Sequence, residues 1–155
     1  MKVYRLDPVG TLDGLKLGDE QDRRPGLREI AVRIRATSLN YRDLKVATGA
    51  YERTAIKPRL IPLSDGAGEV VAAGPSVTRV KVGDRVAAIF VQRWLAGRID
   101  PAYASSSLGG PSDGVLAERI VLSEEGVVSI PAHLTFEEAA TLPCAALTAW
   151  HALFA

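Results

Sequence analysis

The chain has only one cysteine, Cys144, among its 155 residues. A single cysteine cannot form an internal disulfide, so folding does not require an oxidising compartment. The first residues also lack the charged and then apolar leader that is typical of a secreted protein. We therefore expect a cytoplasmic protein.

The chain has neither a cluster of charges of one sign nor a long apolar run. Lys and Arg number 19 against 18 Asp and Glu, and no basic stripe is interleaved with aromatic residues. No apolar run approaches the roughly 20 residues that span a bilayer. We therefore expect no nucleic-acid partner and no membrane partner. The 47% hydrophobic content, with 14 Gly and 9 Pro, instead suits one globular domain with many turns.

Three glycines, Gly66, Gly68 and Gly74, superficially suggest a dinucleotide-binding loop. Such a loop follows a strand and opens a helix. Here the run 69–73 is rich in valine and alanine and ends at a Gly-Pro pair, which is typical of a strand that enters a turn. A second turn at Gly83 leads into another apolar run. The glycines therefore predict successive barrel strands and no phosphate-binding loop.

Alternation and capping residues predict the other elements. Residues 29–36 alternate, with Ile30, Val32 and Ile34 on one face, which predicts a strand with one buried face. Asn40 can cap a short helix over 41–48 that Gly49 terminates. Further strands are predicted at 2–6, 86–91, 116–122 and 127–130, a long connection at 92–114, a capping box at 135–138, and a helix at 144–155.

Taken together, residues 38–44 (Ser-Leu-Asn-Tyr-Arg-Asp-Leu) and 61–91 resemble the first, GroES-like domain of the medium-chain dehydrogenase/reductase superfamily. The closest similarity is to its zinc-independent, quinone-oxidoreductase-like branch. The resemblance implies a mostly-β fold: a partly open GroES-like barrel with short helices, and a C-terminal helix leading toward a Rossmann domain that the sequence lacks. It divides the chain into a substrate-binding and catalytic domain, 1–134, and a connecting helical segment, 135–155.

The same resemblance bears on zinc. Many relatives of this fold are zinc alcohol dehydrogenases, in which Cys, His and Cys bind the catalytic ion. Asn40 and the triplet Leu63-Ser64-Asp65 stand where the first two ligands would be, and only Cys144 matches the third. Because a catalytic zinc needs three protein ligands, we expect no metal.

The resemblance places Asn40, Tyr41 and Arg42 at an interdomain cleft. The Asn40 amide can hydrogen-bond a ribose hydroxyl or a substrate carbonyl, and its role as a helix cap stays compatible with this. Tyr41 can donate a proton or stack, although an aromatic residue at a helix start commonly packs in the core. Arg42 can pair with a phosphate, and the alternative is a solvated helix face.

Asp65 and Thr148 complete the expected site. A buried Asp65 needs a partner, so it either orients groups in the cleft or forms an ion pair with Arg42 or Arg85. Thr148 matches a family threonine that touches the nicotinamide ring, and the alternative is a threonine bonded to its own helix. The prediction is thus Asn40, Tyr41 and Asp65 as catalytic residues, and Asn40, Arg42 and Thr148 as cofactor-binding residues.

By resemblance, the full-length protein transfers a hydride between NAD(P)H and a small-molecule carbonyl, quinone or activated alkene. We expect this chain alone to be inactive. A truncated, non-catalytic binding or assembly module stays open, because the chain has no nucleotide-binding loop. A co-chaperonin role would rest on fold resemblance alone. The last helix also carries large apolar residues at helical spacing, with no domain to pack against them: Leu147, Trp150, Leu153 and Phe154. This apolar face predicts self-association through the helix.

Overall fold

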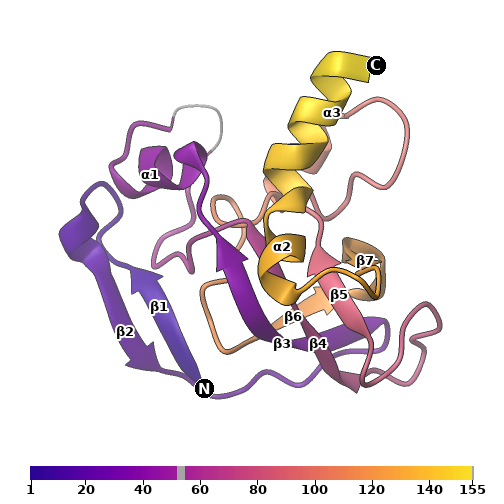
Figure 1. Cartoon of the computed structure of the whole chain (residues 1–155). Coiled ribbons are helices and arrows are strands. Elements are labelled where there is room, and N and C mark those ends of the chain that lie inside the picture. Colours follow the sequence, from indigo (N-terminus) through magenta and orange to yellow (C-terminus); the bar gives the residue numbers. More distant parts are fainter. Residues whose placement is uncertain (52–54, 155) are drawn as a thin grey trace.

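The computed structural model describes residues 1–51 and 55–154 (Figure 1). A five-stranded antiparallel sheet in the order β6-β3-β4-β5-β7 forms most of the fold. Its strands are β3 (Glu29–Ser38), β4 (Asp65–Ala73), β5 (Arg85–Ala88), β6 (Arg119–Ser123) and β7 (Val127–Ser129). The mostly-β fold that the sequence predicts is therefore confirmed.

The core lies on one face of this sheet and follows the alternation of β3. Ile30 and Val32 are buried, and Ile34 packs against the same cluster. The glycines of β4 allow a close approach to β3, since a Cβ atom at Gly68 would lie 2.1 Å from the Arg33 carbonyl oxygen. Strand β4 accordingly begins at Asp65, four residues before the predicted run 69–73. Its glycines do not form a turn but allow the close packing of two strands.

A separate two-stranded ribbon lies beside the sheet. It pairs β1 (Lys2–Leu6) with β2 (Leu15–Asp19), and the turn η1 (Leu12–Gly14) joins them. The sequence predicts β1 but not β2, every residue of which is exposed. Backbone bonds from Tyr4 N to Leu116 O and from Leu6 N to Leu60 O join the ribbon to the rest, so the barrel is partly open.

The helices lie at one end of the sheet, where Figure 1 shows α1 and α3. Helix α1 (Tyr41–Ala47) starts after Asn40 and ends before Gly49, whose φ of +73° suits glycine, as predicted. Helix α2 (Phe136–Ala140) carries the predicted capping box of Thr135 and Glu138. It packs Ala139 and Ala140 on Ala67 and Ala87 of the sheet.

The C-terminal helix differs from its prediction at its start. A π-type turn, η4 (Leu142–Ala146), contains Pro143 and precedes α3 (Leu147–Phe154). Ala155 lies outside the described residues. The long connection 92–114 contains a short 3₁₀ helix, η2 (Pro101–Ser106), and η3 (Glu124–Gly126) joins β6 to β7. Over the described ranges, no helix is both long and apolar enough to cross a bilayer.

Candidate functional site

The start of α1 presents Asn40 in an unusual cap. Its backbone N–H donates to Asp43 Oδ2 at 2.8 Å, and Asp43 N donates to the Asn40 carbonyl oxygen at 2.9 Å. The carboxylate of Asp43 thus closes the helix terminus. Among the described residues, the buried Asn40 Nδ2 atom has no hydrogen-bond partner. The side-chain amide is therefore a donor that the fold leaves unused.

Asp43 is a buried carboxyl group with few partners. The residue is 6% exposed, and its Oδ1 atom has no hydrogen bond within the part of the chain that the structure describes. Burial raises the pKa of Asp43 above its usual value, and the nearby charge of Asp65 adds to this rise. The Asn40 N–H and the Arg42 guanidinium, whose Nη1 lies 3.9 Å away, oppose the rise without cancelling it.

Arg42 connects α1 to the long connection. Its guanidinium lies between the rings of Tyr51 and Phe90, 4.8 Å from each centroid. The Nη1 atom donates to the carbonyl oxygens of Leu108 at 3.0 Å and Gly109 at 3.1 Å. A solvated helix face is therefore wrong for this side chain, which is 11% exposed. Its Nε and Nη2 atoms are buried and have no partner among the described residues.

Asp65 is completely buried, and its partners are not the expected arginines. Its Oδ1 accepts from Ser64 Oγ at 2.9 Å, and its Oδ2 accepts from Cys144 N at 3.0 Å. The predicted ion pair with Arg42 or Arg85 is wrong over the described ranges, since Arg42 lies beside Asp43 and Arg85 donates to the Leu134 carbonyl oxygen. Asp65 therefore fixes the segment that leads into α3.

The backbone immediately before Asp65 is strained. Leu63 is buried and has a φ of +69°, which is uncommon for a residue with a side chain. The Val115 N–H donates to its carbonyl oxygen at 3.0 Å, and the backbones of Gly109 and Gly114 lie against it. Such strain persists where the surroundings over-determine it, and it is concentrated at functional sites.

Cys144 and Thr148 lie on the C-terminal side of the same cluster. Burial raises the pKa of the half-buried Cys144 thiol, and the carboxylates of Asp65 and Asp43 raise it further. The free thiol therefore stays protonated at neutral pH. Thr148 is exposed on α3. Its hydroxyl hydrogen-bonds the Cys144 side chain and lowers the thiol pKa only slightly against these causes.

Tyr41 lies at the surface, with 74% of the residue exposed. The alternative that it packs in the core is wrong. Its ring is 5.6 Å from Lys45 Nζ, one turn later in α1. The phenol therefore adjoins the Asn40 cap and is open to solvent.

Sequence reasoning missed two connections in this cluster. It gave neither Asp43 nor Ser64 a role in the site. The pattern Asn-x-x-Asp at a helix start was a usable signal for the reciprocal cap. No local signal links Asp65 to Cys144, because 79 residues separate them.

The structure thus brings Asn40, Arg42, Asp43, Asp65 and Cys144 together and leaves Tyr41 and Thr148 exposed beside them. The unused groups are N–H donors of the Asn40 amide and the Arg42 guanidinium, together with one carboxylate oxygen of Asp43. Such donors can bind hydroxyl, phosphate or carbonyl oxygens. Within the described residues, no three His, Cys, Asp or Glu side chains gather as metal ligands.

Comparison with known proteins shows the family to which the chain belongs. Residues 26–132 match the alcohol dehydrogenase GroES-like domain. The chain is 40% identical over 151 residues to a zinc-type alcohol dehydrogenase-like protein of Schizosaccharomyces pombe, covering 96% of this chain and 43% of that protein. It is 39% identical over 152 residues to a quinone oxidoreductase of Pseudomonas aeruginosa, covering 98% and 40%.

A solved structure supports the same assignment. A Sinorhizobium meliloti protein assigned to the alcohol dehydrogenases superposes with a TM-score of 0.88 at 41% identity, covering 98% of this chain and 45% of that one. The chain therefore spans only 40–45% of the length of the relatives it matches. It belongs to the alcohol dehydrogenase GroES-like family, within the medium-chain dehydrogenase/reductase oxidoreductases.

Proposed function

We propose that this chain is the substrate-binding part of an NAD(P)H-dependent oxidoreductase that reduces a carbonyl, quinone or activated alkene without zinc. The observation that carries the proposal is the Asn40 amide, whose buried Nδ2 donor has no hydrogen-bond partner among the described residues. The names of the matched relatives, an alcohol dehydrogenase-like protein and a quinone oxidoreductase, support the reaction class.

The unused donors fit a nicotinamide cofactor. Asn40 Nδ2, Arg42 Nε and Arg42 Nη2 are buried and unpaired within the described residues. A dinucleotide offers hydroxyl, phosphate and amide oxygens as acceptors, and Asn40, Arg42 and Thr148 are the residues we propose to hold it. When bound, the nicotinamide supplies the hydride.

Zinc does not fit the same cluster. An amide at Asn40 and a hydroxyl at Ser64 occupy two of the places where ligands would be needed, and the single thiol of Cys144 cannot supply the three protein ligands of a catalytic zinc. Stabilisation of the substrate oxygen must therefore come from hydrogen bonds. We assign this role to Asn40, which is half-buried, so that rotation of its terminal amide can turn the N–H group to the open side.

The other predicted residues take complementary roles. The exposed Tyr41 phenol can deliver a proton to the oxygen of a reduced carbonyl or quinone. Asp65 cannot touch a substrate, because it is fully buried, so we propose it as a positioning residue. It holds Cys144 N and thereby fixes the segment that carries Thr148.

The test uses the protein of the complete reading frame. We expect NADH or NADPH oxidation with a benzoquinone, an aldehyde or an enone, and a loss of about 10²-fold in kcat/KM for Asn40→Ala. Leu39→Ala is the matched control, because Leu39 is the preceding residue and is 80% exposed. Activity that survives a zinc chelator would support the zinc-free reaction. Equal activity of the two variants would contradict the role of Asn40.

A non-catalytic binding or assembly module is the second candidate. The exposed apolar residues of α3 favour it, since Leu153 and Phe154 are 74% and 69% exposed. No oxidation of either cofactor with any of the three acceptor classes would favour this candidate over the enzyme.

A further inference from the structure

A hollow lies away from the Asn40 cluster. It measures about 780 Å³ and is lined by β3, β4 and β6 and by the segment 20–25. Its size falls in the range of small-molecule sites, roughly 300–1,000 Å³. Part of its lining consists of small and medium apolar side chains, among them Ala31 of β3 and Val71 and Ala72 of β4. The cleft residues Asn40, Arg42, Asp65 and Thr148 take no part in its lining.

The lining carries an unbalanced positive charge. Arg33 of β3 is directly opposite Arg119 of β6 in the strand register, and both line the hollow. Like charges that face each other across two strands are destabilising unless a counter-charge compensates them. Arg119 is compensated by Asp22 at 2.5 Å. Arg33 is exposed to solvent, and within the described residues its nearest strand partner with a carboxylate, Glu69, forms its ion pair with Arg35.

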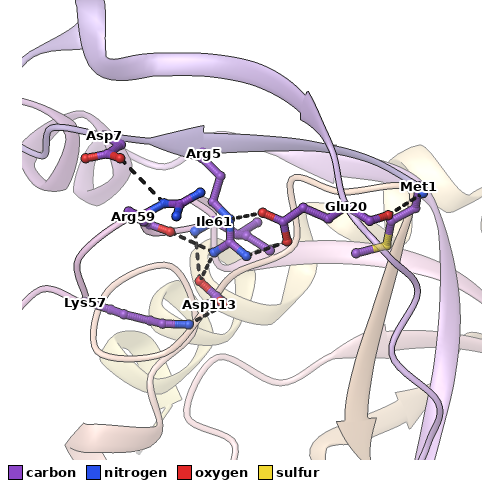
Figure 2. A network of polar contacts seen from close by, with 8 residues as sticks. All are labelled: Met1, Arg5, Asp7, Glu20, Lys57, Arg59, Ile61 and Asp113. Atoms are coloured by element: carbon purple, nitrogen blue, oxygen red, sulfur yellow. Dashed lines mark hydrogen bonds and ion pairs between the residues drawn. The ribbon is translucent and has the colours of Figure 1, made fainter.

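The neighbouring carboxylates are already engaged. Glu69, opposite Arg33 on β4, lies 3.3 Å from Arg35. Figure 2 shows the Arg5 guanidinium between Glu20, at 2.7 Å, and Asp113, at 3.0 Å. Asp113 also accepts hydrogen bonds from Lys57 and from Ile61 N, so both of its oxygens are engaged (Figure 2). The acids around the hollow therefore leave the positive charge of Arg33 unpaired.

We propose that this hollow binds an organic anion in which a carboxylate, sulfonate or phosphate is attached to an apolar body. The Arg33 guanidinium pairs with the anionic group, because its planar fork matches two oxygens of such a group. The apolar body lies against Ala31, Val71 and Ala72. The site is independent of the proposed redox cleft.

The probe is anilinonaphthalene sulfonate, an anion with an apolar body, titrated into the 155-residue chain and followed by amide NMR shifts. We expect shifts at 31–33, 71–72 and 119–122. Arg33→Gln should weaken binding about tenfold, the size of one hydrogen-bonded charge pair. Ala72→Leu, which fills part of the hollow without changing charge, should also weaken it.

Two controls make the result specific. Arg98→Gln removes the same charge from an exposed arginine outside the lining and should bind like the wild type. Neutral phenylnaphthylamine has the same rings without the sulfonate and should bind at least tenfold more weakly. The proposal is overturned if shifts are confined to α3, if both site variants bind like the wild type, or if the neutral probe binds equally well.

Discussion

Glu124 and Asp43 are both buried carboxylates, one in the barrel and one in the cleft. Glu124 is fully buried, and its oxygens accept from Arg28 Nε at 2.9 Å, Thr78 N at 2.7 Å and Arg79 N at 2.8 Å. These donors, the two backbone N–H groups above all, lower the pKa of Glu124 to about 2. Asp43 accepts one backbone hydrogen bond, has an oxygen without a partner among the described residues, and has a raised pKa.

Donor number decides the sign of the shift in this pair. Burial alone disfavours a carboxylate and raises its pKa, whereas several N–H donors reverse the effect. Glu124 ties three distant segments of the barrel together and serves stability. Asp43 leaves part of its bonding capacity unused, which is typical of groups at functional sites.

The largest expected effect is on stability, for Glu124→Gln. Glutamine is neutral, and its single amide oxygen cannot replace the two carboxylate oxygens that accept the three hydrogen bonds. The free energy of unfolding in urea should therefore fall more than for any other substitution considered below. Glu125→Gln is the matched control, because Glu125 also pairs with Arg28 and Arg79 but is half-exposed. It should cost at most about 1 kcal/mol. Equal losses of unfolding free energy in the two variants would contradict a special role for Glu124.

The two carboxylates should also respond to pH with opposite signs. The pKa of Glu124 is lowered from 4.5 to about 2, so its stabilisation is present above pH 4.5 and is lost as the pH falls toward 2. The pKa of Asp43 is raised above 3.8, so its contribution is lost as the pH rises through the folded-state value. Urea unfolding across this range should show a flatter acid limb for Glu124→Gln and a steeper acid limb for Asp43→Asn, because Asp43→Asn removes the contribution that opposes that of Glu124.

The side of the molecule with the Asn40 cluster also exposes apolar side chains, whereas those of the barrel are buried. We predict self-association through α3, in which Trp150 is 65% exposed and packs against Phe154 with the ring centroids 4.7 Å apart and the ring planes tilted by 44°. Trp150→Glu should weaken association about thirtyfold, because burial of one large apolar side chain contributes ~2 kcal/mol. Sedimentation velocity would measure it, with Leu12→Glu as a control on the exposed turn between β1 and β2. A wild-type chain that is monomeric throughout would refute the prediction.

The smallest expected effect belongs to Asp43→Asn. An asparagine oxygen can still accept from Asn40 N, and the change removes a poorly paired buried charge. Stability at neutral pH should therefore change by no more than about 1 kcal/mol. Asp43→Ala, which removes the acceptor, should lose the cap and cost about 1 kcal/mol more. A loss for Asp43→Asn as large as that for Glu124→Gln would show that the donor count does not separate the two sites.

Local sequence patterns predicted the elements whose causes are local. The alternation of β3, the α1 start at Asn40 and stop at Gly49, and the capping box at Thr135 and Glu138 each depend on residues a few positions apart. Strand β2 had no such signal. Both of its faces are exposed, and only its pairing with β1 makes it a strand.

The sequence by itself determined the family and the mostly-β fold, and it predicted Asn40, Arg42 and Asp65, which the structure brings into one cluster. Tertiary structure alone decided their partners: Asp65 binds Cys144 N in place of an arginine, Arg42 lies between two rings, and Asp43 is buried beside Arg42 where it accepts the Asn40 N–H. The physical reason is range. Strand alternation and helix caps act over a few residues, whereas hydrogen-bond partners, burial and pKa shifts depend on groups that only the folded chain brings within a few ångströms.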